Sequence, residues 1–102
     1  ATMTIRSDPE GSEIRALSAI IDLSGQRVLE IGSGTGRLTW QYAGTTARVA
    51  AVEPSTTSVA IARQEIPPSL VDRVEFHQVG FEEYALTSES DLFDTVILSW
   101  SL

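Results

Sequence analysis

Residues 28–38 read Val-Leu-Glu-Ile-Gly-Ser-Gly-Thr-Gly-Arg-Leu, and the rest of the chain is arranged around this stretch. It opens as an apolar run with one acid, Glu30, near its end. Three glycines follow at alternate positions, Gly32, Gly34 and Gly36. Strands and helices contain few glycines, so this spacing indicates a turn whose backbone approaches a ligand or another segment closely. A strand, a glycine turn and a helix start together present N–H groups to a bound cofactor.

The composition narrows the class of protein. The 102 residues, 42% of them hydrophobic, are enough for one small domain with its own core. The net charge is −7 and the seven cationic residues, all arginines, are scattered, which disfavours nucleic acid as a partner. With no cysteine and a single histidine, we expect no metal site. The sequence shows neither a signal peptide nor a membrane span, so we expect a cytoplasmic protein without membrane contact.

Apolar runs alternate with helical patterns along the chain, which predicts an α/β fold with a parallel sheet and flanking helices. The runs 49–52 and 96–98 are apolar on both sides, as strands covered on both faces require. The expected strands are 27–31, 48–53, 71–79 and 92–100. The expected helices are 9–22, 36–43 (with Gly44 as its stop), one that begins at Ser55 or Thr56 and ends at Pro67-Pro68, and at most one helical turn at 80–84; residues 87–91 are expected to form a polar loop.

The sequence predicts a different organisation for the two ends of the chain. Residues 1–8 are expected to be a flexible N-terminal arm, and residues 9–102 one domain. The last predicted strand stops just before Leu102, which would leave a buried parallel strand with an unpaired edge. We therefore expect a domain truncated after its fourth strand, or alternatively a short chain completed by a partner. The sequence gives no oligomeric state.

The glycine spacing discriminates between nucleotide ligands. A dinucleotide site of the G-x-G-x-x-G type would place its third glycine at position 37, which is Arg37 here. Glu30, two residues before the first glycine, does not favour a pyrophosphate at the helix start. It favours a ligand that carries positive charge. This pattern disfavours an NAD(P)-dependent oxidoreductase and favours a cationic nucleoside with an amino acid end.

The stretch from Glu30 to Gly36 resembles the first motif of class I S-adenosylmethionine-dependent methyltransferases, an acid followed by G-x-G-x-G. This resemblance implies a Rossmann-like parallel sheet with flanking helices, of which the chain would hold the first four of seven strands. It also implies that the backbone of Gly32, Ser33, Gly34 and Gly36 passes close to the methionine part of S-adenosyl-L-methionine. Glu30 would anchor the hydrogen-bond network of the site.

A second element of the resemblance is Val-Glu-Pro-Ser at positions 52–55. Glu53 closes the second predicted strand, 21 residues after Gly32. A carboxylate at the end of a strand can accept hydrogen bonds from both ribose hydroxyls, which is the role the family gives this position. Pro54 lies where the family often places a side chain against the adenine. Its alternative role is to bend the chain before the next helix.

Two further elements concern the adenine and the methyl donor. Many relatives carry Gly-Asp where this chain has Gly80-Phe81. Either Glu82 accepts a hydrogen bond from the adenine amine, or a backbone group does and Phe81 lies against the ring; Glu82 as a plain exposed charge is a third reading. The last strand resembles the family's fourth strand and would bring Ser99 beside the amino end of the cofactor. Asp94 is expected to be only a strand-start charge.

The sequence therefore predicts S-adenosylmethionine-dependent methyl transfer. Ser-Trp-Ser-Leu at 99–102 differs from the N/D-P-P-Y/F of amino-methyltransferases that act on nucleic acids and glutamine, so a small-molecule acceptor is favoured. No residue is assigned as a general base, and the catalytic residues stay unknown. His77 is expected to be a strand residue, and Trp40 and Tyr42 are expected to be packing residues. The alternatives are a non-catalytic nucleoside-binding or assembly module and, less favoured, an oxidoreductase.

Overall fold

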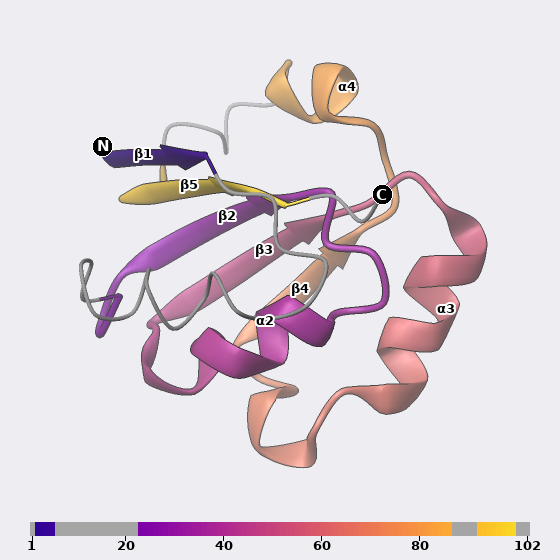
Figure 1. The fold of residues 1–102 in the computed structure, drawn as a ribbon, viewed down its shortest axis with the longest axis horizontal. Coiled ribbons are helices and arrows are strands. Elements are labelled where there is room, and N and C mark those ends of the chain that lie inside the picture. Colours follow the sequence, from indigo (N-terminus) through magenta and orange to yellow (C-terminus); the bar gives the residue numbers. More distant parts are fainter. Residues whose placement is uncertain (1, 6–22, 87–91, 100–102) are drawn as a thin grey trace.

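The computed structural model describes residues 2–5, 23–86 and 92–99 as one parallel sheet with helices packed against it (Figure 1). The strand order is β1-β5-β2-β3-β4, and all four neighbouring pairs are parallel. The strands are β1 (Thr2–Ile5), β2 (Arg27–Ile31), β3 (Arg48–Val52), β4 (Val74–His77) and β5 (Thr95–Leu98). The helices are α2 (Arg37–Tyr42), α3 (Thr56–Glu65) and α4 (Phe81–Ala85), with 3-10 turns η1 (Ala43–Thr45) and η2 (Pro68–Leu70).

The four predicted strands are confirmed as β2, β3, β4 and β5. β2 lies at the centre, with Glu30 opposite Ala51 of β3 on one side and Ile97 of β5 on the other. β4 is shorter than the predicted strand because residues 71–73 form a turn, in which the Arg73 N–H binds the Leu70 carbonyl at 2.9 Å.

The N-terminal segment differs from the expected flexible arm over residues 1–8. Thr2–Ile5 form β1, which pairs in parallel with β5. The outer edge of β5 carries backbone N–H and C=O groups that an extended segment can satisfy, and β1 covers the edge that the sequence leaves unpaired. The helix predicted at 9–22 and the loop predicted at 87–91 fall on residues outside the described ranges, so a domain boundary at residue 9 stays a prediction.

The core lies on both faces of the sheet, as the two-sided apolar runs predict. Side chains alternate between the faces along each strand. On one face, Val28 and Val49 pack with Tyr42 of α2. On the other, Leu29 and Val52 pack with Tyr84 of α4 and with Phe93. The residues of β3 from 49 to 52 are fully buried.

The helix ends are set by local hydrogen bonds. Ser55, not Thr56, caps α3, because its hydroxyl accepts the Ser58 N–H at 3.2 Å. The prediction that Pro67-Pro68 ends α3 is confirmed, since the helix stops at Glu65 with Ile66 as its C-cap. The preceding helix ends where predicted, since α2 stops at Tyr42 with Ala43 as its C-cap and Gly44 directly after it, but Gly44 does not adopt the conformation typical of a glycine stop. Gly44 lies inside η1 without a positive φ, and the chain turns where Thr46 N–H and Oγ1 both bind the Ala43 carbonyl.

Candidate cofactor site

The carboxyl ends of β5, β2, β3 and β4 meet at one edge of the sheet. The chain runs from β2 through β3 to β4 on one side, and β5 lies on the other side of β2. The strand order therefore reverses between β2 and β5, and open α/β sheets bind ligands at such a switch point. The glycine turn follows β2, Glu53 follows β3 and Ser99 follows β5, so the fold brings these predicted site residues to the same edge.

The glycine turn has the backbone that only glycine adopts readily. Gly32, Gly34 and Gly36 have φ values of 80°, 59° and 91°, in the left-handed region that disfavours side chains. The Gly32 N–H donates to the Val52 carbonyl at 2.8 Å, and the Gly36 N–H to the Ser33 carbonyl at 3.1 Å. These bonds fasten the turn to the end of β3 and to itself.

Trp40 packs on the last glycine of the turn. A Cβ atom added to Gly36 would lie 2.3 Å from the indole Cζ2, a distance that real contacts do not allow. The indole also meets the Phe76 ring edge-on, with centroids 6.1 Å apart. The expectation that Trp40 is a packing residue is confirmed, and Gly36 is required both for its φ and for this contact.

Glu30 is fully buried and accepts three hydrogen bonds from hydroxyl groups. Its Oε1 accepts from Thr39 Oγ1 at 2.7 Å and from the Tyr42 hydroxyl at 2.5 Å, and its Oε2 accepts from Ser99 Oγ at 2.5 Å. Burial raises the pKa of Glu30, while the three hydrogen bonds counteract part of the rise. Burial, and then the Glu30 carboxylate, also hold the pKa of Tyr42 well above its usual value. Glu30 thus joins β2, α2 and the end of β5, and it influences the site through these partners because its own carboxylate has no exposed surface.

Glu53 is half-buried beside the turn. Its Oε1 accepts the Gly34 N–H at 2.8 Å and its Oε2 accepts the Ser55 N–H at 3.0 Å. The Glu53 N–H donates to the His77 carbonyl at 3.0 Å, which fixes the end of β3 to β4. A carboxylate offers about four lone-pair directions, so about two remain for further donors such as ribose hydroxyls.

Two serines line the switch point. The Ser99 N–H donates to the Ile31 carbonyl at 2.8 Å, and the Ser99 hydroxyl gives its proton to Glu30. The same hydroxyl also lies 3.5 Å from a second acceptor, the Gly32 carbonyl, at the limit of hydrogen-bond distance. Ser33 is buried within the turn, and its Oγ has no hydrogen-bond partner in the described part of the chain.

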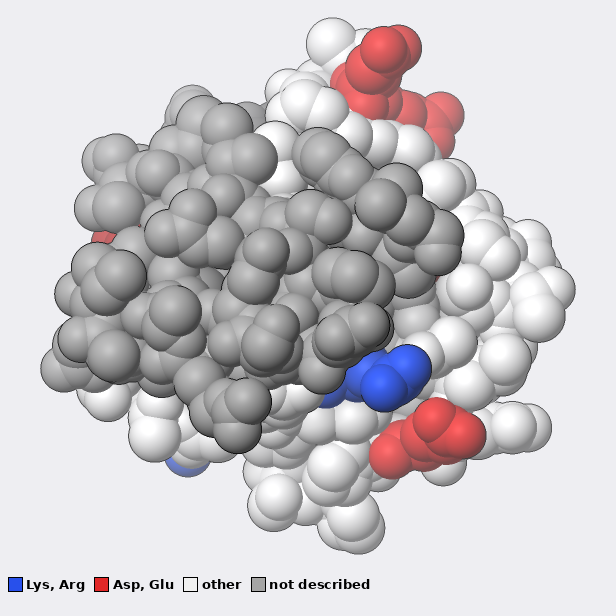
Figure 2. Space-filling view, in the orientation of Figure 1, with Lys and Arg blue, Asp and Glu red and all other residues white. Residues whose placement is uncertain are grey.

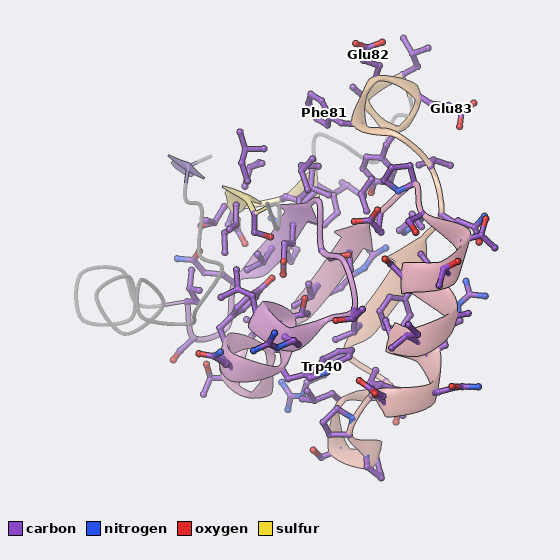
Figure 3. All side chains as sticks on the ribbon, turned by 45° about the vertical axis from the view of Figure 1, so that its right-hand side comes forward. Trp40, Phe81, Glu82 and Glu83 are labelled. Atoms are coloured by element: carbon purple, nitrogen blue, oxygen red, sulfur yellow. The ribbon has the colours of Figure 1, made fainter. Side chains whose placement is uncertain are left out.

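The residues predicted near the adenine lie directly after Glu53 and on α4. Pro54 is exposed between Glu53 and the cap residue of α3. Phe81, the first residue of α4, is 48% exposed. Figure 3 shows Phe81 on the side of α4 opposite Glu83, with Glu82 pointing away from the sheet. Phe81 as a contact of the adenine ring and Glu82 as an acceptor for the adenine amine both stay predictions.

His77 ends β4, far from the methyl-donor side of the site. Its ring meets the Tyr84 ring edge-on, with centroids 5.0 Å apart. β4 lies three strands from β5, and strand spacing puts their ends about 14 Å apart. His77 is therefore too distant to exchange a proton with a group beside Ser99, in line with its interpretation as a strand residue.

Sequence reasoning missed the hydroxyl donors of Glu30. Thr39 and Tyr42 are three residues apart on α2, so they share one helix face, and both are buried. The sequence did contain a signal for these donors: two residues with hydroxyl groups share the buried face of the helix that follows the strand with Glu30. Tyr42 was expected only to pack, but it also donates to Glu30.

Residues 22–102 match the family described as Methyltransferase domain. The chain therefore belongs to this family, and its fold is that of class I S-adenosylmethionine-dependent methyltransferases. Magnesium-protoporphyrin O-methyltransferase of Rhodobacter capsulatus is 38% identical over 81 residues, covering 79% of this chain and 34% of that protein. The chain spans about a third of the length of the curated relatives it matches.

Two solved structures show the same architecture. A glycopeptide N-methyltransferase complexed with sinefungin is 29% identical, with a TM-score of 0.70 over 94% of this chain and 41% of the other. An RNA methyltransferase from Salinibacter ruber in complex with S-adenosyl-L-homocysteine is 25% identical, with a TM-score of 0.70 over 84% of this chain and 56% of the other. The acceptors for which these proteins are named thus differ in chemical class.

Within the described ranges, no helix is long and apolar enough to cross a membrane. The same residues contain no group of three or more His, Cys, Asp or Glu side chains placed to hold a metal ion.

Proposed function

We propose that the intact protein transfers a methyl group from S-adenosyl-L-methionine to a small-molecule acceptor, and that this chain holds the cofactor. The observation that carries the proposal is the contact between the Glu53 carboxylate and the Gly34 N–H at the carboxyl edge of the sheet. This hydrogen bond joins Glu53, which is expected to bind the ribose, to the glycine turn, which is expected to lie under the methionine part of the cofactor. The two features are 19 residues apart in sequence.

The side chains fit the parts of this cofactor in order along the sheet edge. Glu53, half-buried with lone pairs to spare, suits the two ribose hydroxyls. Gly32, Ser33, Gly34 and Gly36, with Ser99 beside them, suit the methionine end. Pro54 and the exposed ring of Phe81 suit the adenine. When bound, the cofactor supplies a methyl group on a sulfonium, and the contribution of the protein is to orient it and exclude water.

Charge supports a small-molecule acceptor over a polyanion. The chain carries a net charge of −7, and acidic side chains gather over α4 beside the site (Figure 2). Arg27 and Arg48 form ion pairs with Asp94 and Glu75, which weakens their attraction for phosphates. The 38%-identical relative is named for magnesium-protoporphyrin, a small-molecule acceptor. No described residue is assigned as a general base.

A nucleoside-binding module without catalysis is the second candidate. One observation favours it: every described residue assigned to the site is proposed to contact the cofactor, and none is proposed to contact an acceptor. The two candidates share cofactor binding and differ only in whether methyl transfer takes place afterwards.

Calorimetry on the intact protein tests the shared part of both candidates. S-adenosylhomocysteine is expected to bind and NAD is not; binding of NAD alone would contradict both. A methyl-transfer assay with a tritiated donor then separates them, using a porphyrin carboxylate, a phenol, an amine and an RNA oligonucleotide. Transfer to a small acceptor supports the enzyme, transfer to RNA alone overturns the small-molecule acceptor, and binding without any transfer supports the module.

A further inference from the structure

We infer that Glu53 is a positioning residue for the glycine turn, in addition to the ribose contact assigned to it above. The inference rests on the proposed function for the identity of the ligand. The positioning role itself comes from contacts that the protein makes without any ligand.

Gly34 at the tip of the turn depends on a side chain for its hydrogen bond. The N–H groups of Gly32 and Gly36 donate to backbone carbonyls, those of Val52 and Ser33. The Gly34 N–H instead donates to Glu53 Oε1 at 2.8 Å, across 19 residues of sequence. Gly34 has φ 59°, and glycine visits both signs of φ with little preference. Without the carboxylate, the tip of the turn therefore loses the contact that selects its conformation.

Backbone bonds to the Val52 carbonyl hold the near end of the turn, and contacts of α2 hold its far end. Thr39 and Tyr42 fasten α2 to Glu30, and the Trp40 indole packs on Gly36. These interactions begin at Gly36 and do not reach Gly34. Glu53 also accepts the Ser55 N–H at 3.0 Å, so one carboxylate fixes the tip of the turn to the start of α3.

The positioning role and the ribose role are compatible. The two N–H groups use about half of the lone-pair directions of the carboxylate, and the side chain is only half-buried. A bound nucleoside can therefore donate to Glu53 while Gly34 stays attached. The turn is then already in place when the ligand arrives, which reduces the ordering that binding requires.

A ligand without ribose hydroxyls separates the two roles. The affinities of the intact wild-type protein and of Glu53→Ala are measured for S-adenosylhomocysteine and for its 2′,3′-dideoxy analogue. Glu53→Ala is expected to bind the dideoxy analogue about tenfold more weakly than wild type does, the size of one charge-assisted hydrogen bond. The loss for S-adenosylhomocysteine is expected to be larger, about a hundredfold, because the ribose contacts are lost as well. Equal binding of the dideoxy analogue by both proteins overturns the inference.

Hydrogen exchange tests the same role without a ligand. In Glu53→Ala and in Glu53→Gln, the Gly34 amide is expected to exchange faster than in wild type while the Leu29 amide in β2 is unchanged. Glu53→Gln keeps one acceptor oxygen and most of the side-chain shape, so its effect is expected to be the smaller of the two. Glu65→Ala, which removes an exposed acid at the far end of α3, is the matched control.

The two experiments fail in different ways. If wild-type protein does not bind S-adenosylhomocysteine, the proposed function is wrong, and the exchange rate of Gly34 still decides the positioning role. Unchanged exchange at Gly34, or an equal increase at Leu29, overturns the positioning role even if the ligand binds.

Discussion

At the scale of single residues, Gly36 combines two constraints that can be measured separately. Its φ of 91° is unfavourable for any residue with a Cβ, and the position of that Cβ is occupied by the Trp40 indole. Gly25 has a similar φ of 70°, but a Cβ there would meet nothing within 4 Å. The chain therefore offers a matched pair of glycines.

We expect Gly25→Ala to lower the free energy of unfolding by about 1 kcal/mol, the cost of the left-handed backbone alone. Gly36→Ala is expected to cost about 2–4 kcal/mol, because overpacking against Trp40 adds to the same backbone term. Urea denaturation of the intact protein gives both values. Equal losses for the two variants would show that the indole moves aside without cost.

At the scale of elements, Glu30 connects β2, α2 and the end of β5. Its two carboxylate oxygens accept different numbers of hydrogen bonds. Oε1 has two donors, Thr39 and Tyr42 of α2, whereas Oε2 has Ser99 at the end of β5. Removing one donor from Oε1 leaves the other in place. Removing Ser99 Oγ leaves Oε2 without a donor among the residues that the structure describes, in a fully buried position.

Ser99→Ala is accordingly expected to destabilise the protein more than Tyr42→Phe, by about 2–3 kcal/mol against about 1 kcal/mol. The double variant is expected to cost more than the sum of the two, since the carboxylate then keeps Thr39 as its single hydroxyl donor among the described contacts. Thermal or urea unfolding of the four proteins completes the cycle. A larger loss in Tyr42→Phe would contradict the assignment.

The sequence predicted the positions of the helices and strands better than the contacts between them. β2, β3 and the apolar part of β5 were predictable because burial on both faces leaves continuous apolar runs. The position of Glu53 directly after β3 was predictable from the end of the apolar run, whereas its ribose role stays a prediction. The pairing of β1 with β5 and the donors of Glu30 were not, because they depend on which segments meet in space. Gly44 follows the C-cap of α2 as predicted, but it lacks the positive φ typical of that position, and Thr46, two residues later, completes the hydrogen bonds of the helix end.

At the scale of the whole molecule, two carboxylates give stability opposite dependences on pH. Burial raises the pKa of Glu30 above the value of about 4.3 in an unfolded chain. Between these two pKa values the folded protein holds a proton that the unfolded chain has released, so stability falls as pH rises through this window. Hydrogen bonds from Arg27 lower the pKa of Asp94. Its stabilising contribution is therefore present above about pH 3.9 and is lost as pH falls through the lowered value.

Glu30→Gln and Asp94→Asn separate these contributions, because each removes one titrating group. The free energy of unfolding is measured in urea from pH 3 to 8 for wild type and both variants. Relative to Glu30→Gln, wild type is expected to gain stability as pH falls toward about 4.3. Relative to Asp94→Asn, it is expected to lose stability below about pH 3.9, and added salt should shrink this difference because the Arg27 and Asp94 side chains are 50% and 42% exposed. Salt is expected to leave the Glu30 difference nearly unchanged, since that carboxylate is fully buried, so equal sensitivity of the two differences to salt would contradict the burial of Glu30 beneath the glycine turn.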